Sequence, residues 1–122
     1  MKLKYSAGGR KPLAQARVIR ALRHLNCTNQ PGTVGAILRL EPTLNRSSCT
    51  TAVAALVKDC GLIVQVLPGS AGIRSCTLAT YAHRAGANLS ETDLRYFTRM
   101  ENTALLMLSE HEQAKAVLTH GA

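Results

Sequence analysis

The chain has few aromatic residues and no long apolar run. Aromatic side chains make up 3% of its 122 residues, and tryptophan is absent. With so few rings, a surface that stacks unpaired bases is not expected. No apolar run approaches the roughly 18 residues that a membrane-spanning helix needs, and no apolar signal core follows Lys2 and Lys4. We therefore expect a soluble, cytoplasmic protein.

Carboxylates are scarce before residue 85. Only Glu41 and Asp59 oppose twelve lysines and arginines there, which gives this part of the chain a net charge of +10, whereas residues 85–122 carry three basic and five acidic side chains. A polyanion such as nucleic acid is the usual partner of so basic a segment, and the alternative is that the charge only favours solubility. Without paired acids, a phosphate-binding glycine loop or grouped histidines, an enzyme is not expected.

The four cysteines lack the spacing of a disulfide framework or a zinc finger. They are Cys27, Cys49, Cys60 and Cys76, with no Cys-x-x-Cys pair among them. His24 lies three residues before Cys27 and would suit half of a zinc site, but no second half is visible. We therefore expect small buried cysteines, with no bound metal and no cofactor.

The first part of the chain predicts a basic arm and an amphipathic helix. Residues 1–11 contain a Gly-Gly pair and four cations, and we expect them to form a flexible arm, with Lys2, Lys4, Arg10 and Lys11 available to DNA. From Leu13 to Leu25, apolar residues recur every three or four positions. Arg17, Arg20 and Arg23 fall on the opposite side of this helix, as a solvated face or, alternatively, a phosphate-contacting face.

Two further helices are expected on either side of a Glu-Pro turn. Thr33 is a suitable N-cap for a short helix through Leu40. Asn45 is a suitable N-cap for a helix over 46–60, and Gly61 follows where a left-handed residue ends a helix. The face of the 46–60 helix opposite its apolar stripe carries mostly small and hydroxyl side chains, which would let it enter the major groove of DNA.

The remainder predicts a hairpin and a helical tail. Residues 62–67 and 73–80 have β-rich composition and flank a Pro-Gly turn at 68–72. Residues 82–89 are expected to be a loop. From Ser90, a candidate N-cap, to about Thr119 there is no Pro or Gly, which indicates one long helix or two shorter ones.

This order of elements resembles the winged helix-turn-helix DNA-binding regulators. The resemblance is carried by TVGAILRL (33–40), EPTLN (41–45), RSSCTTAVAALVKDCGL (46–62) and IVQVLPGSAGIRSCTLAT (63–80). Within that class the chain looks most like the small dimeric regulators of the MarR and Rrf2 types, and its Gly-Ser-Ala-Gly turn is similar to the glycine-rich Rrf2 wing. A cluster-binding Rrf2 protein would carry three cysteines after the wing, and residues 82–122 contain none.

The resemblance implies a mainly α fold with a small β-hairpin. Residues 12–81 would form the winged helix-turn-helix domain, and the loop 82–89 would lead to a C-terminal helical dimerisation segment at 90–122. Helix 46–60 would be the recognition helix, which binds with Arg46, Ser47, Ser48, Thr51, Ala52 and Lys58, while Ser70 and Arg74 on the wing would lie near phosphate. The implied function is a dimeric, sequence-specific transcriptional repressor of double-stranded DNA.

Homodimerisation is expected through a heptad in the tail. The apolar positions of this pattern and its second edge are Leu94, Phe97, Met100, Ala104, Met107, Leu108, His111 and Leu118. The alternative is that the tail folds back onto its own winged helix. The alternative to DNA binding is a protein-interaction module, of the kind used as a phage or plasmid inhibitor or adaptor, in which the Ser/Thr/Ala face binds another protein.

Overall fold

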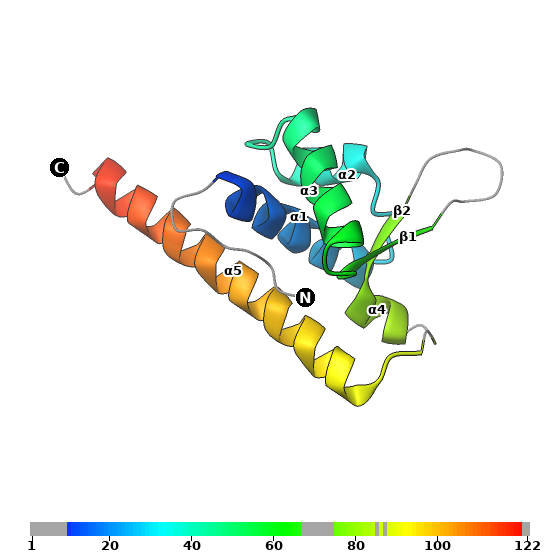
Figure 1. The fold of residues 1–122 in the computed structure, drawn as a ribbon. Helices are drawn as coiled ribbons and strands as arrows, with labels where there is room; N and C mark the ends of the chain where they lie inside the picture. The colour runs from blue at the N-terminus through cyan, green and yellow to red at the C-terminus, as the bar shows by residue number, and fades with distance from the viewer. Residues whose placement is uncertain (1–9, 67–74, 85, 87, 121–122) are drawn as a thin grey trace.

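A computed structural model of the chain describes residues 10–66, 75–84, 86 and 88–120 (Figure 1). The elements, in order, are α1 (Arg10–Cys27), α2 (Val34–Leu40), α3 (Arg46–Lys58), β1 (Ile63–Val66), β2 (Ser75–Leu78), α4 (Ala79–Arg84) and α5 (Glu91–His120). The described chain is therefore mainly helical with one small antiparallel hairpin, which confirms the predicted fold class at this level. Within those ranges, no helix combines the length and the apolarity that crossing a bilayer requires.

Helix α1 forms the centre of the molecule. It packs against α2, α3 and β2 on one side and against α5 on the other (Figure 1). Val18, Ile19 and Leu22 on this helix are fully buried, and each large apolar side chain removed from water contributes about 1.5–3 kcal/mol. The other elements are held together chiefly through their contacts with α1.

The predicted arm extends too far along the chain. Helix α1 begins at Arg10, so the backbone of Arg10 and Lys11 belongs to the helix rather than to an arm over 1–11. Pro12 permits this because its missing N–H falls in the first turn, where no intrahelical acceptor exists. The remaining part of the predicted arm, residues 1–9, lies outside the described residues.

The caps of α2 and α3 are confirmed. The Thr33 hydroxyl oxygen accepts from the Ala36 N–H at 3.2 Å, and the Asn45 side-chain oxygen accepts from the Ser48 N–H at 2.7 Å. Helix α3 is two residues shorter than predicted, since it ends at Lys58 and Asp59 is its C-cap. Gly61 then takes a φ of +68°, the left-handed conformation that glycine adopts without a steric penalty.

The hairpin pairs Ile63 with Leu78 and Val66 with Ser75. Strand β1 begins one residue later than predicted, and β2 ends two residues earlier. The expected turn at 68–72 lies outside the described residues. The loop expected at 82–89 is corrected at its start, because residues 79–84 form helix α4 directly after β2. This segment contains neither Gly nor Pro, and the Arg84 guanidinium lies 5.0 Å from the centre of the Tyr81 ring.

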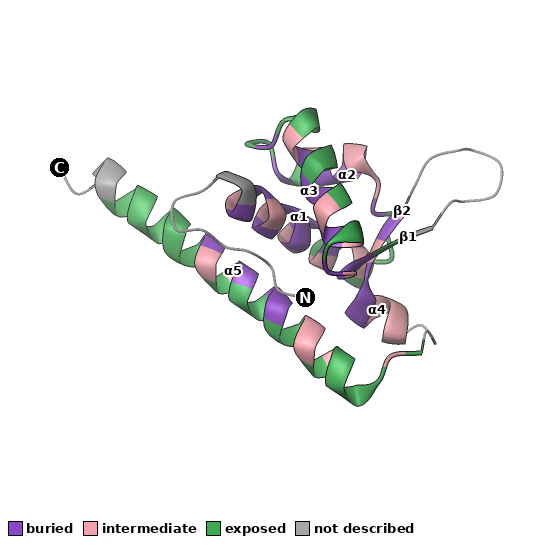
Figure 2. Cartoon of the chain, viewed as in Figure 1, coloured by how far each residue is buried: buried purple, intermediate pink, exposed green. Residues whose placement is uncertain are grey.

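Helix α5 is one continuous helix rather than two. The Ser90 hydroxyl oxygen accepts from the Asp93 N–H at 3.1 Å, which confirms Ser90 as the N-cap. Met100, Ala104 and Leu108 form a buried stripe along the helix, on the side that packs against α1 (Figure 2). Contact with α1 along the Met100–Leu108 stripe stabilises the middle of this 30-residue helix.

Gly32 fixes the segment before α2 against β2. Its carbonyl accepts from the Cys76 N–H at 2.9 Å, and its own N–H donates to the Ser75 hydroxyl at 3.3 Å. A Cβ at this position would overlap the Cys76 carbonyl oxygen and would lie 2.7 Å from Cδ2 of Leu22. Only glycine therefore allows the two backbones to approach this closely.

Replacement of Gly32 by alanine is expected to lower the free energy of unfolding by about 2 kcal/mol, because the added methyl group overpacks a backbone contact. Gly35→Ala is the matched control, since a Cβ there meets nothing within 4 Å and alanine favours helix α2. Urea denaturation of both variants measures the difference. Equal midpoints for the two variants would contradict this account of Gly32.

Candidate nucleic-acid interface

Helix α3 presents a narrow, polar face to solvent. Cys49, Ala52, Val53 and Leu56 bury its inner side against α1 and the hairpin. The exposed side chains on the outer side are Arg46, Ser47, Thr50, Thr51, Ala54 and Lys58. None of these except the two cations is longer than threonine, so another surface can approach the helix backbone closely.

The structure brings together most, but not all, of the side chains predicted for this face. Arg46, Ser47, Thr51 and Lys58 are exposed as expected. Ser48 is half-buried at the edge of the face, and its backbone N–H donates to the Asn45 side-chain oxygen.

Ala52 was placed wrongly, because it is 4% exposed and belongs to the core. At 100° per residue it lies on the same side as Cys49 and Leu56. Sequence reasoning also missed Thr50 and Ala54, which the same helical period would have placed on the outer side.

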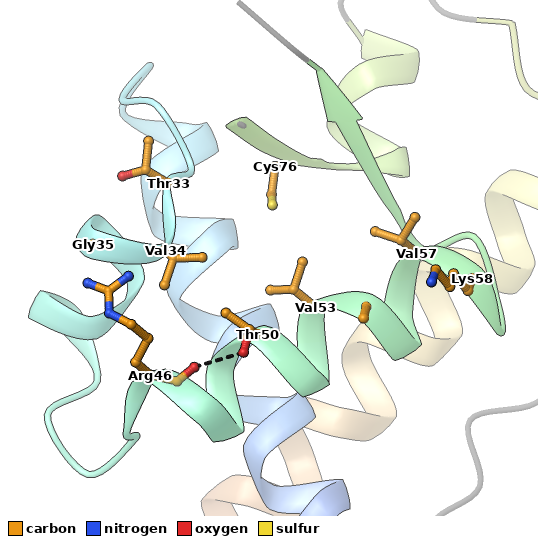
Figure 3. A pocket seen from close by; sticks show the side chains of 10 residues that line it. Thr33, Val34, Gly35, Arg46, Thr50, Val53, Val57, Lys58 and Cys76 are labelled. Carbon is orange, nitrogen blue, oxygen red and sulfur yellow. Dashed lines mark hydrogen bonds between the residues drawn. The ribbon is translucent and has the colours of Figure 1, made fainter. Parts of the chain in front are cut away.

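A groove of about 550 Å³ runs beside α3, between this helix, the start of α2 and strand β2 (Figure 3). Arg46 lies at one end and Lys58 at the other, with Val34, Val53 and Val57 along it. None of the described residues that line the groove is acidic. The groove is therefore positive at both ends and apolar between them.

Three cations around α3 are available to a partner. Within the part of the chain that the structure describes, Arg39, Arg46 and Lys58 are exposed and make no ion pair. Of the two carboxylates that precede residue 85, Glu41 is buried and already paired, so only Asp59 opposes these cations. The charge of this side of the molecule is thus open to an anion.

Arg20 and Arg23 of α1 form ion pairs within the chain, which differs from both the solvated and the phosphate-contacting role predicted for them. Arg20 binds the buried Glu41 through two nitrogens, at 2.7 and 2.8 Å, and also binds Glu112 of α5 at 2.7 Å. Arg23 donates to Glu101 at 3.1 Å. These two side chains join α1 to the α2–α3 turn and to α5, rather than forming a solvated or phosphate-contacting row.

Glu101 is the most deeply buried carboxylate of this network. It is 2% exposed, and one of its oxygens accepts from the Thr80 hydroxyl at 2.6 Å while the other accepts from Arg23. A buried carboxylate is stable only when its oxygens are satisfied in this way. The network therefore stabilises the position of α5 and leaves none of its members for a ligand.

The residues predicted for dimerisation are largely used within the chain. Met100, Ala104 and Leu108 are buried in its own core, and Phe97 and Met107 are partly buried against that core. Leu94 is half-buried and His111 is exposed, while the side chain of Leu118 lies outside the described part. The alternative expectation, that the tail folds back onto its own domain, describes this stripe correctly.

The cysteines follow the predicted pattern with one exception. Cys49, Cys60 and Cys76 are buried, and burial raises the pKa of the Cys49 and Cys60 thiols. Cys27 was expected to be buried and is exposed, because it is the last residue of α1. Among the residues that the structure describes, no group of three or more His, Cys, Asp or Glu side chains is arranged to hold a metal ion.

The predicted site residues Lys2, Lys4, Ser70 and Arg74 lie outside the described residues, and Arg10 and Lys11 are placed by their backbone alone. Comparison of the chain with protein-family models, with curated proteins and with solved structures finds no match in any of the three. The face of α3 and the groove beside it are therefore the features from which a function can be inferred.

Proposed function

We propose that the protein is a transcriptional regulator that binds duplex DNA, with α3 in the major groove and a winged helix-turn-helix arrangement around it. Helices α2 and α3, joined by residues 41–45, would be the helix-turn-helix, and β1 and β2 would be the strands of the wing. The observation that carries the proposal is the charge around α3. Among the residues that the structure describes, Arg39, Arg46 and Lys58 are exposed there without ion pairs, and none of those that line the groove is acidic.

The side chains of α3 suit distinct parts of the duplex. Arg46 is the first residue of the helix, and an arginine at that end can bind guanine with two hydrogen bonds or a phosphate. Ser47 and Thr51 are exposed hydroxyl residues that can bind phosphate oxygens or base edges. Arg39 and Lys58 lie at the ends of α2 and α3 and are suited to the phosphate backbone.

Arg46→Ala is expected to weaken specific binding by about 1–3 kcal/mol if Arg46 contacts a base edge, and Lys58→Ala is expected to weaken binding to all sequences. Each removed phosphate contact should also reduce the slope of log K against log salt by about 1. Fluorescence anisotropy with duplexes selected from a random pool, repeated between about 50 and 200 mM salt, measures both quantities.

Arg95→Ala is the matched control, because it removes the same charge from α5, where Arg95 is exposed and pairs with Glu91 at 2.7 Å. Its affinity should equal that of the unaltered protein. If duplex DNA is not bound at low salt, or if Arg46→Ala and Arg95→Ala bind equally well, the proposal is wrong.

A second candidate function is favoured by the apolar part of the groove. Val34, Val53 and Val57 would contact a segment of another protein that has apolar side chains between two acidic ones, and these would pair with Arg46 and Lys58. In that case Val57→Asp, at a half-buried position on the groove, would abolish binding to the protein partner. A folded protein that binds no duplex DNA at low salt would favour this function over the first.

A further inference from the structure

Helix α5 carries a second stripe of heptad spacing, the outer stripe, on the side away from α1. It comprises Arg99, Thr103, Leu106, Glu110, Gln113 and Val117, which recur alternately every four and three residues. All six are exposed, and Leu106 and Val117 are the most exposed large apolar side chains of the described chain, at 60% and 67%. The helix therefore has one apolar stripe that is covered by α1 and another heptad stripe that nothing in the described chain covers.

The last part of α5 lacks the packing that usually stabilises a helix. Residues 109–117 are exposed at every position, although Glu112 pairs with Arg20 of α1, and the end of the helix extends past the start of α1 (Figures 1 and 2). Most helices in proteins depend on tertiary contacts rather than on intrinsic propensity. A partner on the outer stripe would supply those contacts.

The charges of the outer stripe are complementary to those of an inverted copy of itself. A twofold axis perpendicular to the helix between Ala104 and Leu105 places Arg99 opposite Glu110 of the partner subunit, and the symmetry repeats this pair. The same axis places Thr103 opposite Leu106 of the partner subunit, close to the centre. In a parallel, in-register pair, Arg99 would face a second Arg99 and Glu110 a second Glu110, which like-charge repulsion disfavours.

Neither of these charged side chains has an ion-pair partner in the part of the chain that the structure describes. The structure gives Arg99 and Glu110 no ion pair among the described residues, in contrast to Arg20, Arg23 and Arg95. The two lie eleven residues apart on one straight helix, about 16 Å along its axis, and cannot reach each other. An inverted second copy brings each into contact with its opposite charge.

We propose that two copies of the chain associate through the outer stripe of α5 in antiparallel orientation, with Arg99 of each copy paired to Glu110 of the partner subunit. The interface is isologous and closes on itself, so it gives a dimer rather than a filament. It uses none of the buried residues of the Met100–Leu108 stripe. It also does not depend on DNA binding.

Sedimentation equilibrium without DNA tests the proposal by charge exchange. Arg99→Glu and Glu110→Arg should each be monomeric, because each places two like-charged pairs in the interface. An equimolar mixture of these two variants should form a heterodimer, and the double variant R99E/E110R should form a homodimer again. Arg84→Glu, which makes the same charge change at an exposed position of α4, should dimerise like the unaltered protein.

Three outcomes would overturn this interface. They are a monomeric unaltered protein at the highest soluble concentration, single variants that remain dimeric, and single variants that become monomeric but do not reassociate when mixed. Circular dichroism should show a cooperative thermal transition in every variant, because both positions are exposed, and monomeric variants should lose helix content only at the end of α5.

Discussion

Leu108→Glu is expected to unfold the protein. Leu108 is 1% exposed and lies in the stripe of α5 that packs against α1. A glutamate there would place a carboxylate without a partner in the core, at a cost of about 4 kcal/mol or more in addition to the lost apolar contacts. Since a domain of this size is stable by only about 5–15 kcal/mol, most molecules should lose their cooperative thermal transition.

Leu106→Glu is the matched control for this change. Leu106 lies on the same helix but on its outer side, and it is 60% exposed. Its replacement should leave the core packing and the cooperative thermal transition unchanged and should affect association between copies. Near-ultraviolet and far-ultraviolet circular dichroism of the two variants distinguishes unfolding from dissociation. A well-folded, monomeric Leu108→Glu variant would show that Leu108 belongs to an interface between chains instead.

Arg20→Met is expected to lower the free energy of unfolding by about 3 kcal/mol. The change leaves the Glu41 carboxylate, whose side chain is 6% exposed, without either of its two hydrogen bonds to Arg20. Removal of one partner from a buried ion pair costs about 3–5 kcal/mol, and we take the lower end because the Arg20 side chain is 39% exposed and water screens it.

Glu41→Gln in the Arg20→Met background should restore part of the lost stability, because a neutral amide is less costly to bury than an unpaired carboxylate. Urea denaturation of the single and double variants completes a double-mutant cycle. If Arg20→Met alone melts like the unaltered protein, the Arg20–Glu41 pair has no part in holding the α2–α3 turn.

The same arginine makes stability depend on acid pH. Hydrogen bonding to Arg20 lowers the pKa of Glu112 below that of an ordinary glutamate. This contribution to stability is present above the unfolded pKa of glutamate, and it is lost as the pH falls through the lower folded value. Arg20→Met should therefore flatten this part of the stability profile. Measurement of denaturation midpoints from neutral to acid pH tests the direction.

The local features of the fold could be predicted because each has a cause close by in the sequence. Thr33 and Asn45 are caps whose acceptors lie three residues from their donors. Gly61 takes a left-handed conformation two residues after the Asp59 C-cap, and glycine adopts this conformation without help from distant residues. The paired strands follow from two β-rich runs of the sequence, although β1 begins one residue later and β2 ends two residues earlier than predicted.

The sequence could not predict which surface packs against each face of a helix such as α5. A heptad of apolar residues indicates that one side of a helix is covered, but it does not say whether the same chain or a second copy covers it. The apolar stripe of Met100, Ala104 and Leu108 was therefore predicted to form a dimer interface. The structure instead places Leu108 in the core of its own chain. The outer stripe was not predicted, because four of its six residues are polar or charged and a search for apolar periodicity does not identify it.

Ion pairs between residues far apart in the sequence could not be predicted either. Arg20 binds Glu41 and Glu112, which are 21 and 92 residues away, and no periodic signal links such positions. The face of α3 was predicted more closely, because helical period alone places Arg46, Ser47, Thr51 and Lys58 outside. The prediction that Ala52 is exposed was wrong, because an alanine fits equally well on a buried or an exposed side of a helix.

The contact between α1 and α5 has a consequence for the order of events at the ribosome. Helix α1 is synthesised first of the described elements and α5 last, yet α5 covers one side of α1 and supplies the carboxylate of Glu101 to Arg23. While α5 is still being made, that side of α1 remains open to water. The nascent chain thus displays apolar surface that the finished molecule hides, and chaperones can bind it during this interval.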